Sequence, residues 1–192
     1  AEAESLRITC DRAELIDGQQ ILELGCGWGS LSLWMAERYR NSRITAVSNS
    51  APQRRFIERE AASRGLANLS VITADMNDFS ANAQFDRVVS VEMFEHMANW
   101  HALLSRTRTW LKPEGRLFLH IFTHRHRPAT YDWRDPEDWM GQHFFTGGDA
   151  RPVFVGDRLD LADGRYGYGS RAVDLQSLTH GTPQYICKMV VV

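Results

Sequence analysis

The chain has 192 residues, of which 43% are hydrophobic, and a formal net charge of −2. This length suffices for one domain with a substantial core, and the mixed charges argue against a nucleic-acid partner. The sequence has no apolar run of membrane-spanning length and no signal peptide, so we expect no integral membrane contact. Cys10, Cys26 and Cys187 form no C-x-x-C pair, which favours a reducing, cytoplasmic location.

Helical and strand-like segments alternate along the first two thirds of the chain. Residues 1–15 have an amphipathic helical pattern, and short apolar runs predict strands at 20–24, 43–48, 69–74, 85–91 and 116–122. Helices are expected at 30–40, from Ser50 to Gly65 and at 100–111, with a turn at 112–115. This order predicts an α/β fold of three layers: a doubly wound, mostly parallel sheet with helices on both faces.

Residues 21–29 read Ile-Leu-Glu-Leu-Gly-Cys-Gly-Trp-Gly. A buried strand that leads into a Gly-rich turn and a helix N-terminus is typical of a nucleotide-cofactor site. Glycine occupies every second position from 25 to 29, and the acidic residue Glu23 comes before them. Dinucleotide-binding loops instead have the pattern G-x-G-x-x-G, with an acidic residue after it. S-adenosyl-L-methionine has no phosphate, and its ammonium and carboxylate groups fit an acid and free loop N–H groups. We therefore expect this cofactor to contact Glu23, Gly25, Cys26, Gly27 and Gly29.

The next strand ends supply further candidates, because ligands of such sheets bind at the carboxyl ends of the strands. Asn49 can hydrogen-bond a ribose hydroxyl, with Gln53 close behind it. Asp75 can accept a hydrogen bond from an adenine amino group, and Met76 offers a soft wall for the ring. The expected cofactor residues in this part of the chain are Asn49, Gln53, Asp75, Met76 and Val91.

Two carboxylates and an imidazole crowd the end of the fourth expected strand. Glu92, Glu95 and His96 share one face if a helical turn begins there, and we expect them to be the catalytic residues. Three residues further along are expected on the substrate side: His120, Phe122 and Trp139. A metal site is not expected, because His120, His124 and His126 have no thiolate or carboxylate cluster beside them.

Several runs together resemble one known family: ILELGCGWGSLSLWMAERY, ITAVSNSAPQ, TADMNDF, SVEMFEHMANW, WLKPEGRLFLHIFTH and DWMGQHFFTGG. They are similar to the coclaurine N-methyltransferase branch of the cyclopropane-fatty-acid-synthase-like methyltransferases, over about residues 3–148. The resemblance implies a class I methyltransferase sheet and cofactor contacts at Gly25, Gly27, Asn49, Gln53, Asp75 and Met76. It also implies catalytic roles for Glu95 and His96, with Glu92 nearby. In the cyclopropane synthases of this family, the positions that match Glu95 and His120 belong to a bicarbonate-binding pocket.

Two regions depart from this family. We expect the chain to lack the family's helical N-terminal region before the first strand, and residues 149–192 to form an irregular tail without the usual C-terminal antiparallel hairpin. We therefore expect a methyltransferase domain at 1–148 and a tail at 149–192, of which 184–192 reads as one strand. A shift of reading frame near Asp149 is one explanation, because one codon choice for Asp149-Ala150-Arg151 reads Met-Pro, the pair usual in the family, in the next frame.

The expected function is methyl transfer from S-adenosyl-L-methionine to a small-molecule amine, with His96 as general base and Glu95 holding the substrate ammonium or orienting the imidazole. Three alternatives stay open: cyclopropanation or methylation of an unsaturated lipid, a truncated non-catalytic remnant, and, less favoured, a nicotinamide-dependent oxidoreductase. Trp28, Trp34 and Trp110 are expected to be core or helix-packing residues. The sequence leaves the methyl acceptor and the oligomeric state open.

Overall fold

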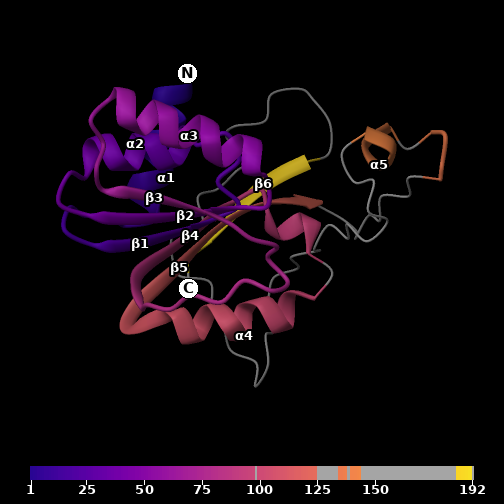
Figure 1. Cartoon of the computed structure of the whole chain (residues 1–192). Coiled ribbons are helices and arrows are strands. Elements are labelled where there is room, and N and C mark those ends of the chain that lie inside the picture. The colour runs from indigo at the N-terminus through magenta and orange to yellow at the C-terminus, as the bar shows by residue number, and fades with distance from the viewer. Residues whose placement is uncertain (98, 125–133, 138, 144–184, 192) are drawn as a thin grey trace. The chain divides into compact units, whose positions relative to one another are not determined.

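The structure is a computed structural model, and it describes residues 1–97, 99–124, 134–137, 139–143 and 185–191 (Figure 1). The chain forms two compact units. The first unit comprises residues 1–91, 103–119 and 191, and the second comprises residues 92–102, 120–190 and 192.

The strands form a six-stranded sheet in the order β3-β2-β1-β4-β5-β6. They are β1 (Gln20–Leu24), β2 (Arg43–Ser48), β3 (Leu69–Thr73), β4 (Phe85–Val91), β5 (Leu111–His124) and β6 (Tyr185–Val191). β1 pairs in parallel with both β2 and β4, and β2 pairs in parallel with β3. The chain order reverses at β1, so the carboxyl ends of β1 and β4 flank the switch point where such sheets bind ligands.

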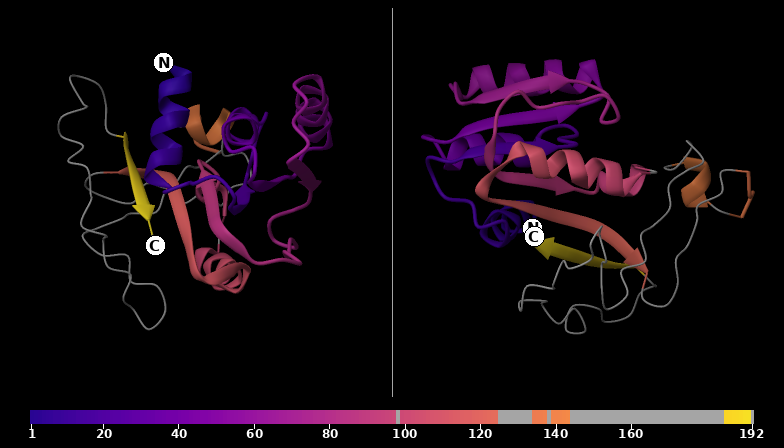
Figure 2. Two further views of the ribbon diagram at one scale, coloured as in Figure 1. Left: turned by 90° about the vertical axis from the view of Figure 1, so that its left-hand side faces the viewer. Right: turned by 90° about the horizontal axis from the view of Figure 1, so that it is seen from below.

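Helices cover both faces of the sheet in the first unit, which confirms the three-layer α/β prediction. α2 (Ser30–Arg38) and α3 (Ala51–Ser63) lie on one face, whereas α4 (Trp100–Trp110) lies on the other, as Figures 1 and 2 show. α1 (Glu2–Arg12) packs beside α2. The core between these layers is apolar, and its fully buried side chains include Ile21, Leu22, Leu24, Met35 and Ile57.

The helix boundaries follow local signals in the sequence. Ser50 caps α3 by accepting a hydrogen bond from Gln53 N, and Pro52 lies in its first turn. Gly65, with φ of +64°, closes α3, and the N–H of the next residue, Leu66, donates to the carbonyl of Ala61. α1 ends earlier than the expected residue 15 by the same device, because Glu14 takes a φ of +53° and Leu15 N donates to Cys10 O.

The start of β5 differs from the prediction. The strand begins at Leu111 and therefore includes the expected turn at residues 112–115. The backbone is tight there, since a Cβ on Gly115 would lie 2.8 Å from the carbonyl oxygen of Phe85 and 2.9 Å from Lys112 N. The other strands of the first unit match their predicted ranges to within one residue, and β6 matches the strand expected at 184–192.

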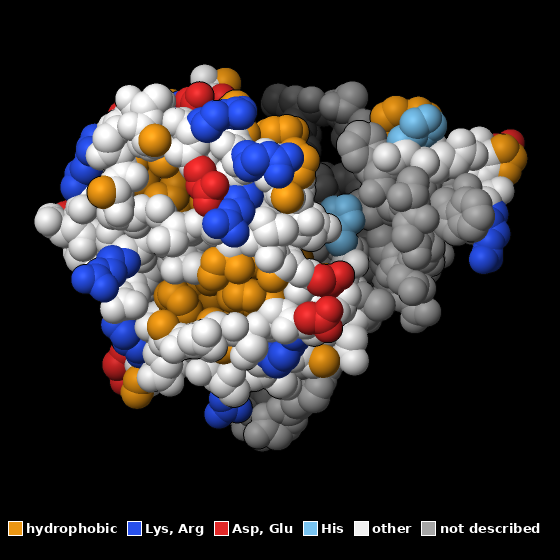
Figure 3. Space-filling view, viewed as in Figure 1, with side chains coloured by type: hydrophobic (Ala, Val, Ile, Leu, Met, Phe, Trp, Pro, Cys, Tyr) orange, Lys and Arg blue, Asp and Glu red, His pale blue; other side chains and the backbone are white. Residues whose placement is uncertain are grey.

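No helix within the described ranges is long and apolar enough to cross a membrane. On the face seen in Figure 3, basic and acidic side chains are scattered among several small hydrophobic groups. A fifth helix, α5 (Trp139–His143), belongs to the second unit.

Candidate functional site

The turn between β1 and α2 is shaped by its glycines. Gly25, Gly27 and Gly29 all have positive φ values, of +81°, +52° and +85°. Gly29 is the N-cap residue of α2 and is packed so tightly that a Cβ there would lie 2.6 Å from Ile57 Cγ1 of α3. A Cβ on Gly27 would instead meet no atom within 4 Å. The loop is therefore closed on the α3 side and open at Gly27, where a ligand can approach the backbone.

Three of the loop N–H groups that were expected to face a ligand already donate to backbone carbonyl groups. Gly25 N and Cys26 N both donate to Val47 O at 3.0 Å, and Gly29 N donates to Cys26 O at 2.8 Å. Within the described chain, no acceptor is recorded for the N–H groups of Gly27 and Trp28. Gly25, Cys26 and Gly29 therefore shape the loop, whereas Gly27 and Trp28 can present donors to an anionic group.

Glu23, in β1, is buried rather than open to the solvent. Its side chain accepts a hydrogen bond from the Ser32 hydroxyl of α2, and only 4% of the residue is exposed. Burial raises its carboxyl pKa to about 7, and the Ser32 hydrogen bond opposes this shift. Burial also raises the pKa of the Cys26 thiol to about 12, which fits a small packing residue and not a nucleophile.

Two predicted cofactor residues follow β2, of which one is exposed and the other is held by a hydrogen bond. Asn49 is exposed, directly after the strand. Gln53 is half-buried, and its Oε1 accepts a hydrogen bond of 2.6 Å from the Ser48 hydroxyl. Ser48 was not predicted as a site residue, although its place at the end of β2 was a usable signal. The structure shows that it orients Gln53.

The segment after β3 forms a compact turn around Asp75. Its Oδ1 accepts hydrogen bonds from the N–H and the side-chain amide of Asn77, at 2.8 and 2.9 Å. For its other oxygen, Oδ2, no partner is recorded in the described chain. Met76 is 9% exposed, so its side chain is mostly covered. Arg106 of α4 donates to three carbonyl groups of this turn, and no signal in the sequence indicated it.

Trp28 is expected in the core or packed against a helix, and the structure shows the second, since its ring packs against α3. It is 59% exposed, and its ring makes an edge contact with Phe56 at 5.4 Å between centroids. Trp110 is buried as expected, at 3% exposure. At the end of β4, Val91 is half-buried.

The expected catalytic residues belong to the second unit, and they do not share a helical face. Glu92 precedes the short 3-10 helix Phe94–His96 and has a φ of +53°, which is uncommon outside glycine. Glu95 is 2% exposed, whereas His96 is exposed. The predicted i, i+3, i+4 face requires an α-helical turn from residue 92, and the positive φ at Glu92 prevents one.

Desolvation acts on two of these side chains. It raises the pKa of the Glu92 carboxyl above its ordinary value and lowers the pKa of the His96 imidazole. The neutral form of His96 therefore prevails at neutral pH, as a proton acceptor requires.

The expected substrate-side residues are only partly described. His120, in β5, is half-buried, and its carbonyl accepts a hydrogen bond of 2.8 Å from the N–H of Glu92, the residue that follows β4. Phe122 lies in β5, but its side chain and that of His124 are outside the described part, as is His126 altogether. Trp139 is 59% exposed and stacks on His143 at 4.9 Å.

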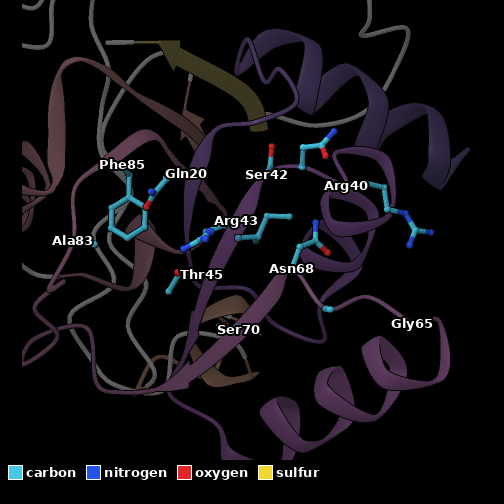
Figure 4. A pocket seen from close by; sticks show the side chains of 13 residues that line it. Gln20, Arg40, Ser42, Arg43, Thr45, Gly65, Asn68, Ser70, Ala83 and Phe85 are labelled. Carbon is cyan, nitrogen blue, oxygen red and sulfur yellow. The ribbon is translucent and has the colours of Figure 1, made fainter.

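A cavity of about 800 Å³ lies within the first unit (Figure 4). Its lining includes Gln20, Arg43 and Phe85, which begin β1, β2 and β4. It therefore lies at the amino ends of the strands. The predicted cofactor residues follow the carboxyl ends, so this cavity is not the candidate site.

Comparison with known proteins identifies relatives for most of the chain. The chain is 40% identical over 148 residues to (S)-coclaurine N-methyltransferase from Thalictrum flavum subsp. glaucum, an alignment that covers 77% of this chain and 41% of that protein. It is 32% identical over 150 residues to the cyclopropane-fatty-acyl-phospholipid synthase of Escherichia coli (strain K12), covering 77% of this chain and 36% of the relative. The chain thus spans about two fifths of the length of these relatives.

The fold has solved counterparts as well. The crystal structure of coclaurine N-methyltransferase bound to N-methylheliamine and SAH matches with a TM-score of 0.74 at 37% identity, over 80% of this chain and 45% of that one. The cyclopropane synthase MmaA2 from Mycobacterium tuberculosis matches with a TM-score of 0.57 at 26% identity, over 63% and 42%. The family model described as mycolic acid cyclopropane synthetase matches residues 1–153, and the chain belongs to this family.

Proposed function

We propose that the chain is part of an S-adenosyl-L-methionine-dependent methyltransferase that methylates the nitrogen of a small-molecule amine. The observation that carries this proposal is the turn between β1 and α2, which is open at Gly27 and offers two donors beside it. The N-methyltransferase among the relatives, at 40% identity, supports the choice of an amine as acceptor.

The residues at the strand ends fit the parts of this cofactor. The N–H groups of Gly27 and Trp28 would bind its carboxylate, and Glu23 would act on its ammonium group directly or through water. Asn49 would bind the ribose, with Gln53 close by, and Oδ2 of Asp75 would accept from the adenine amino group. Apolar contact would come from Met76 and Val91. Gly25, Cys26 and Gly29 would contribute through the shape of the loop.

When bound, S-adenosyl-L-methionine supplies an electrophilic sulfonium methyl group. An amine attacks only as a neutral lone pair, so the chain must remove or accept a proton. His96 is proposed as the base, since desolvation lowers its pKa and keeps it neutral near pH 7. Glu95, which is buried, would hold the substrate ammonium or orient the imidazole. Glu92 is proposed to assist, and His120, Phe122 and Trp139 to contact the substrate.

The test measures methyl transfer and cofactor binding separately. The chain is incubated with S-adenosyl-L-methionine and a panel of secondary and tertiary amines, and products heavier by one methyl group are sought by mass spectrometry. His96→Ala and Glu95→Gln should each lower turnover by at least about 100-fold, as expected for a general base and its partner. The affinity for S-adenosyl-L-homocysteine should change little. Unchanged turnover in both variants would remove these residues from the mechanism.

A second function is favoured by the family itself. The matching family model is that of the mycolic acid cyclopropane synthetases, and a bacterial cyclopropane-fatty-acyl-phospholipid synthase is 32% identical to this chain. Vesicles of unsaturated phospholipid therefore belong in the same assay. Transfer to lipid with none to amines would establish this alternative.

A chain that binds cofactor without catalysing transfer is separated by the same measurements. A thermal shift with S-adenosyl-L-methionine, but not with NAD, together with no product in any arm, would indicate a non-catalytic cofactor-binding protein. We propose a cytoplasmic location, because Cys10 and Cys26 are free and buried thiols that suit a reducing compartment.

A further inference from the structure

The guanidinium of Arg106 holds the turn that follows β3. Its Nη2 donates to Met76 O at 2.7 Å, and its Nη1 donates to Asn77 O at 2.7 Å and to Phe79 O at 3.2 Å. Three carbonyl groups from four consecutive residues thus converge on one side chain of α4. Backbone amides of the turn are used elsewhere, because Asp78 N and Phe79 N both donate to Asp75 O.

Arg106 is itself fixed by its surroundings. It is half-buried, and its guanidinium carbon lies 5.9 Å from the ring centroid of Trp110, one helical turn along α4. Trp110 is 3% exposed and makes an edge contact with Phe79 at 5.2 Å. The cation, the indole and the phenyl ring therefore join the last turns of α4 to the turn after β3.

The same turn carries the residues assigned above to the adenine ring. The side chain of Asp75 is oriented by the two bonds from Asn77 to its Oδ1, which leave Oδ2 for a ligand, and the carbonyls of Met76 and Asn77 are both bound by Arg106. Loss of the guanidinium would leave three carbonyl groups to find other donors, and the direction of the Asp75 carboxylate would change with them.

We infer that Arg106 is a positioning residue for the purine end of the cofactor, and that through the 75–79 turn it sets the preference for a 6-amino purine. This inference rests on the proposed function. A fork of two donating nitrogens is needed, because three separate carbonyls must be bound at once. Lysine offers one nitrogen and would bind fewer of them.

The first test needs no cofactor. Arg106→Gln is compared with Arg108→Gln, which removes an exposed arginine from the same helix, and folding is checked by circular dichroism and thermal melting. Amide hydrogen exchange at Asp78 and Phe79 should be at least about tenfold faster in Arg106→Gln and unchanged in Arg108→Gln. Equal protection in the two variants would show that Arg106 does not hold the turn.

The second test measures affinity for S-adenosyl-L-homocysteine and for its analogue that has hydrogen in place of the 6-amino group. The unaltered chain should prefer the amino compound by about tenfold, the value of one good hydrogen bond. In Arg106→Gln this preference should fall towards about one, whereas Arg108→Gln should retain it. A merely destabilised variant would lose affinity for both ligands equally and keep the ratio.

Each outcome of these tests is decisive. An unchanged ratio in a folded Arg106→Gln overturns the inference and leaves the proposed function intact, whereas no binding of either ligand by the unaltered chain overturns both. Arg106→Lys serves if the glutamine variant does not fold, because it keeps the cation beside Trp110. A reduced ratio in this variant supports the inference, and a full ratio refutes it.

Discussion

Glu23 illustrates, at the residue scale, how burial changes a common side chain. The residue is 4% exposed and its carboxyl accepts a hydrogen bond from Ser32, and burial raises its pKa from about 4.5 to about 7. Between pH 4.5 and pH 7 the Glu23 carboxyl is mostly ionised in the unfolded chain, whereas it is mostly protonated in the folded chain. The folded state therefore binds more protons, and the free energy of unfolding falls as the pH rises through this window.

The pH dependence of stability tests this directly. At 1.36 kcal/mol per unit, Glu23 should lower the free energy of unfolding by about 3 kcal/mol between pH 4.5 and pH 7. Glu23→Gln cannot ionise, so this part of the slope should vanish in urea unfolding measured across that range. Glu37→Gln, at an exposed position of α2, should keep the slope. The same slope in Glu23→Gln and the unaltered chain would contradict the assignment.

At the scale of elements, one glycine fixes how α2 packs against α3. A Cβ on Gly29 would meet three side-chain carbons of Ile57 within 3.3 Å. Ile57 is fully buried in α3, so its β-branched side chain has little room to move. The glycine is thus required by the contact between two helices as well as by its own positive φ.

Two alanine variants separate these causes. Gly27 also has a positive φ, but a Cβ there would meet nothing within 4 Å. Gly27→Ala should cost about 1 kcal/mol from backbone conformation alone, whereas Gly29→Ala should cost about 3 kcal/mol because overlap with Ile57 is added. Urea unfolding measures both. Equal losses in the two variants would mean that α3 yields to the extra methyl group.

At the scale of the whole molecule, Asp86 connects strands that are far apart in the sequence. Its Oδ2 in β4 accepts hydrogen bonds of 2.8 Å from Gln20 N, at the start of β1, and from Lys112 Nζ, at the start of β5. Partial burial opposes ionisation, but these donors outweigh it and the pKa of Asp86 is lowered. A lowered pKa stabilises the fold above the ordinary value near 3.8, and this stabilisation is lost as the pH falls through the folded pKa.

Replacement of each partner should show which bond matters. Asp86→Ala removes the acceptor of the partly buried Gln20 amide of β1 and should cost about 1–2 kcal/mol at pH 7. Lys112→Gln removes only a partly exposed ion pair and should cost less than about 1 kcal/mol. The difference between Asp86→Ala and the unaltered chain should shrink below pH 4 in urea unfolding. A loss that stays constant with pH would assign the effect to packing.

Periodicity and punctuation in the sequence were enough to place most elements. β1, β2 and β4 lie where predicted. α3 begins after its cap residue Ser50 and ends before Gly65, as the sequence predicts. These signals are local, since a cap or a turn depends on neighbouring backbone groups. The end of α1 was not predicted, because Glu14 ends the helix with a positive φ. Glutamate is not a residue type that usually takes this conformation, so no signal in the sequence indicated it.

The sequence by itself determined the alternation of strands and helices, the Gly-rich turn and the residues that follow each strand, because these depend on contacts within a few positions. Only the tertiary structure decided which loop amides are already bonded, that Glu23 is buried against Ser32, that Trp28 is exposed and that Arg106 holds a turn about 30 residues earlier in the chain. Such contacts join distant segments, and they follow from the order and packing of the elements, which no local pattern encodes.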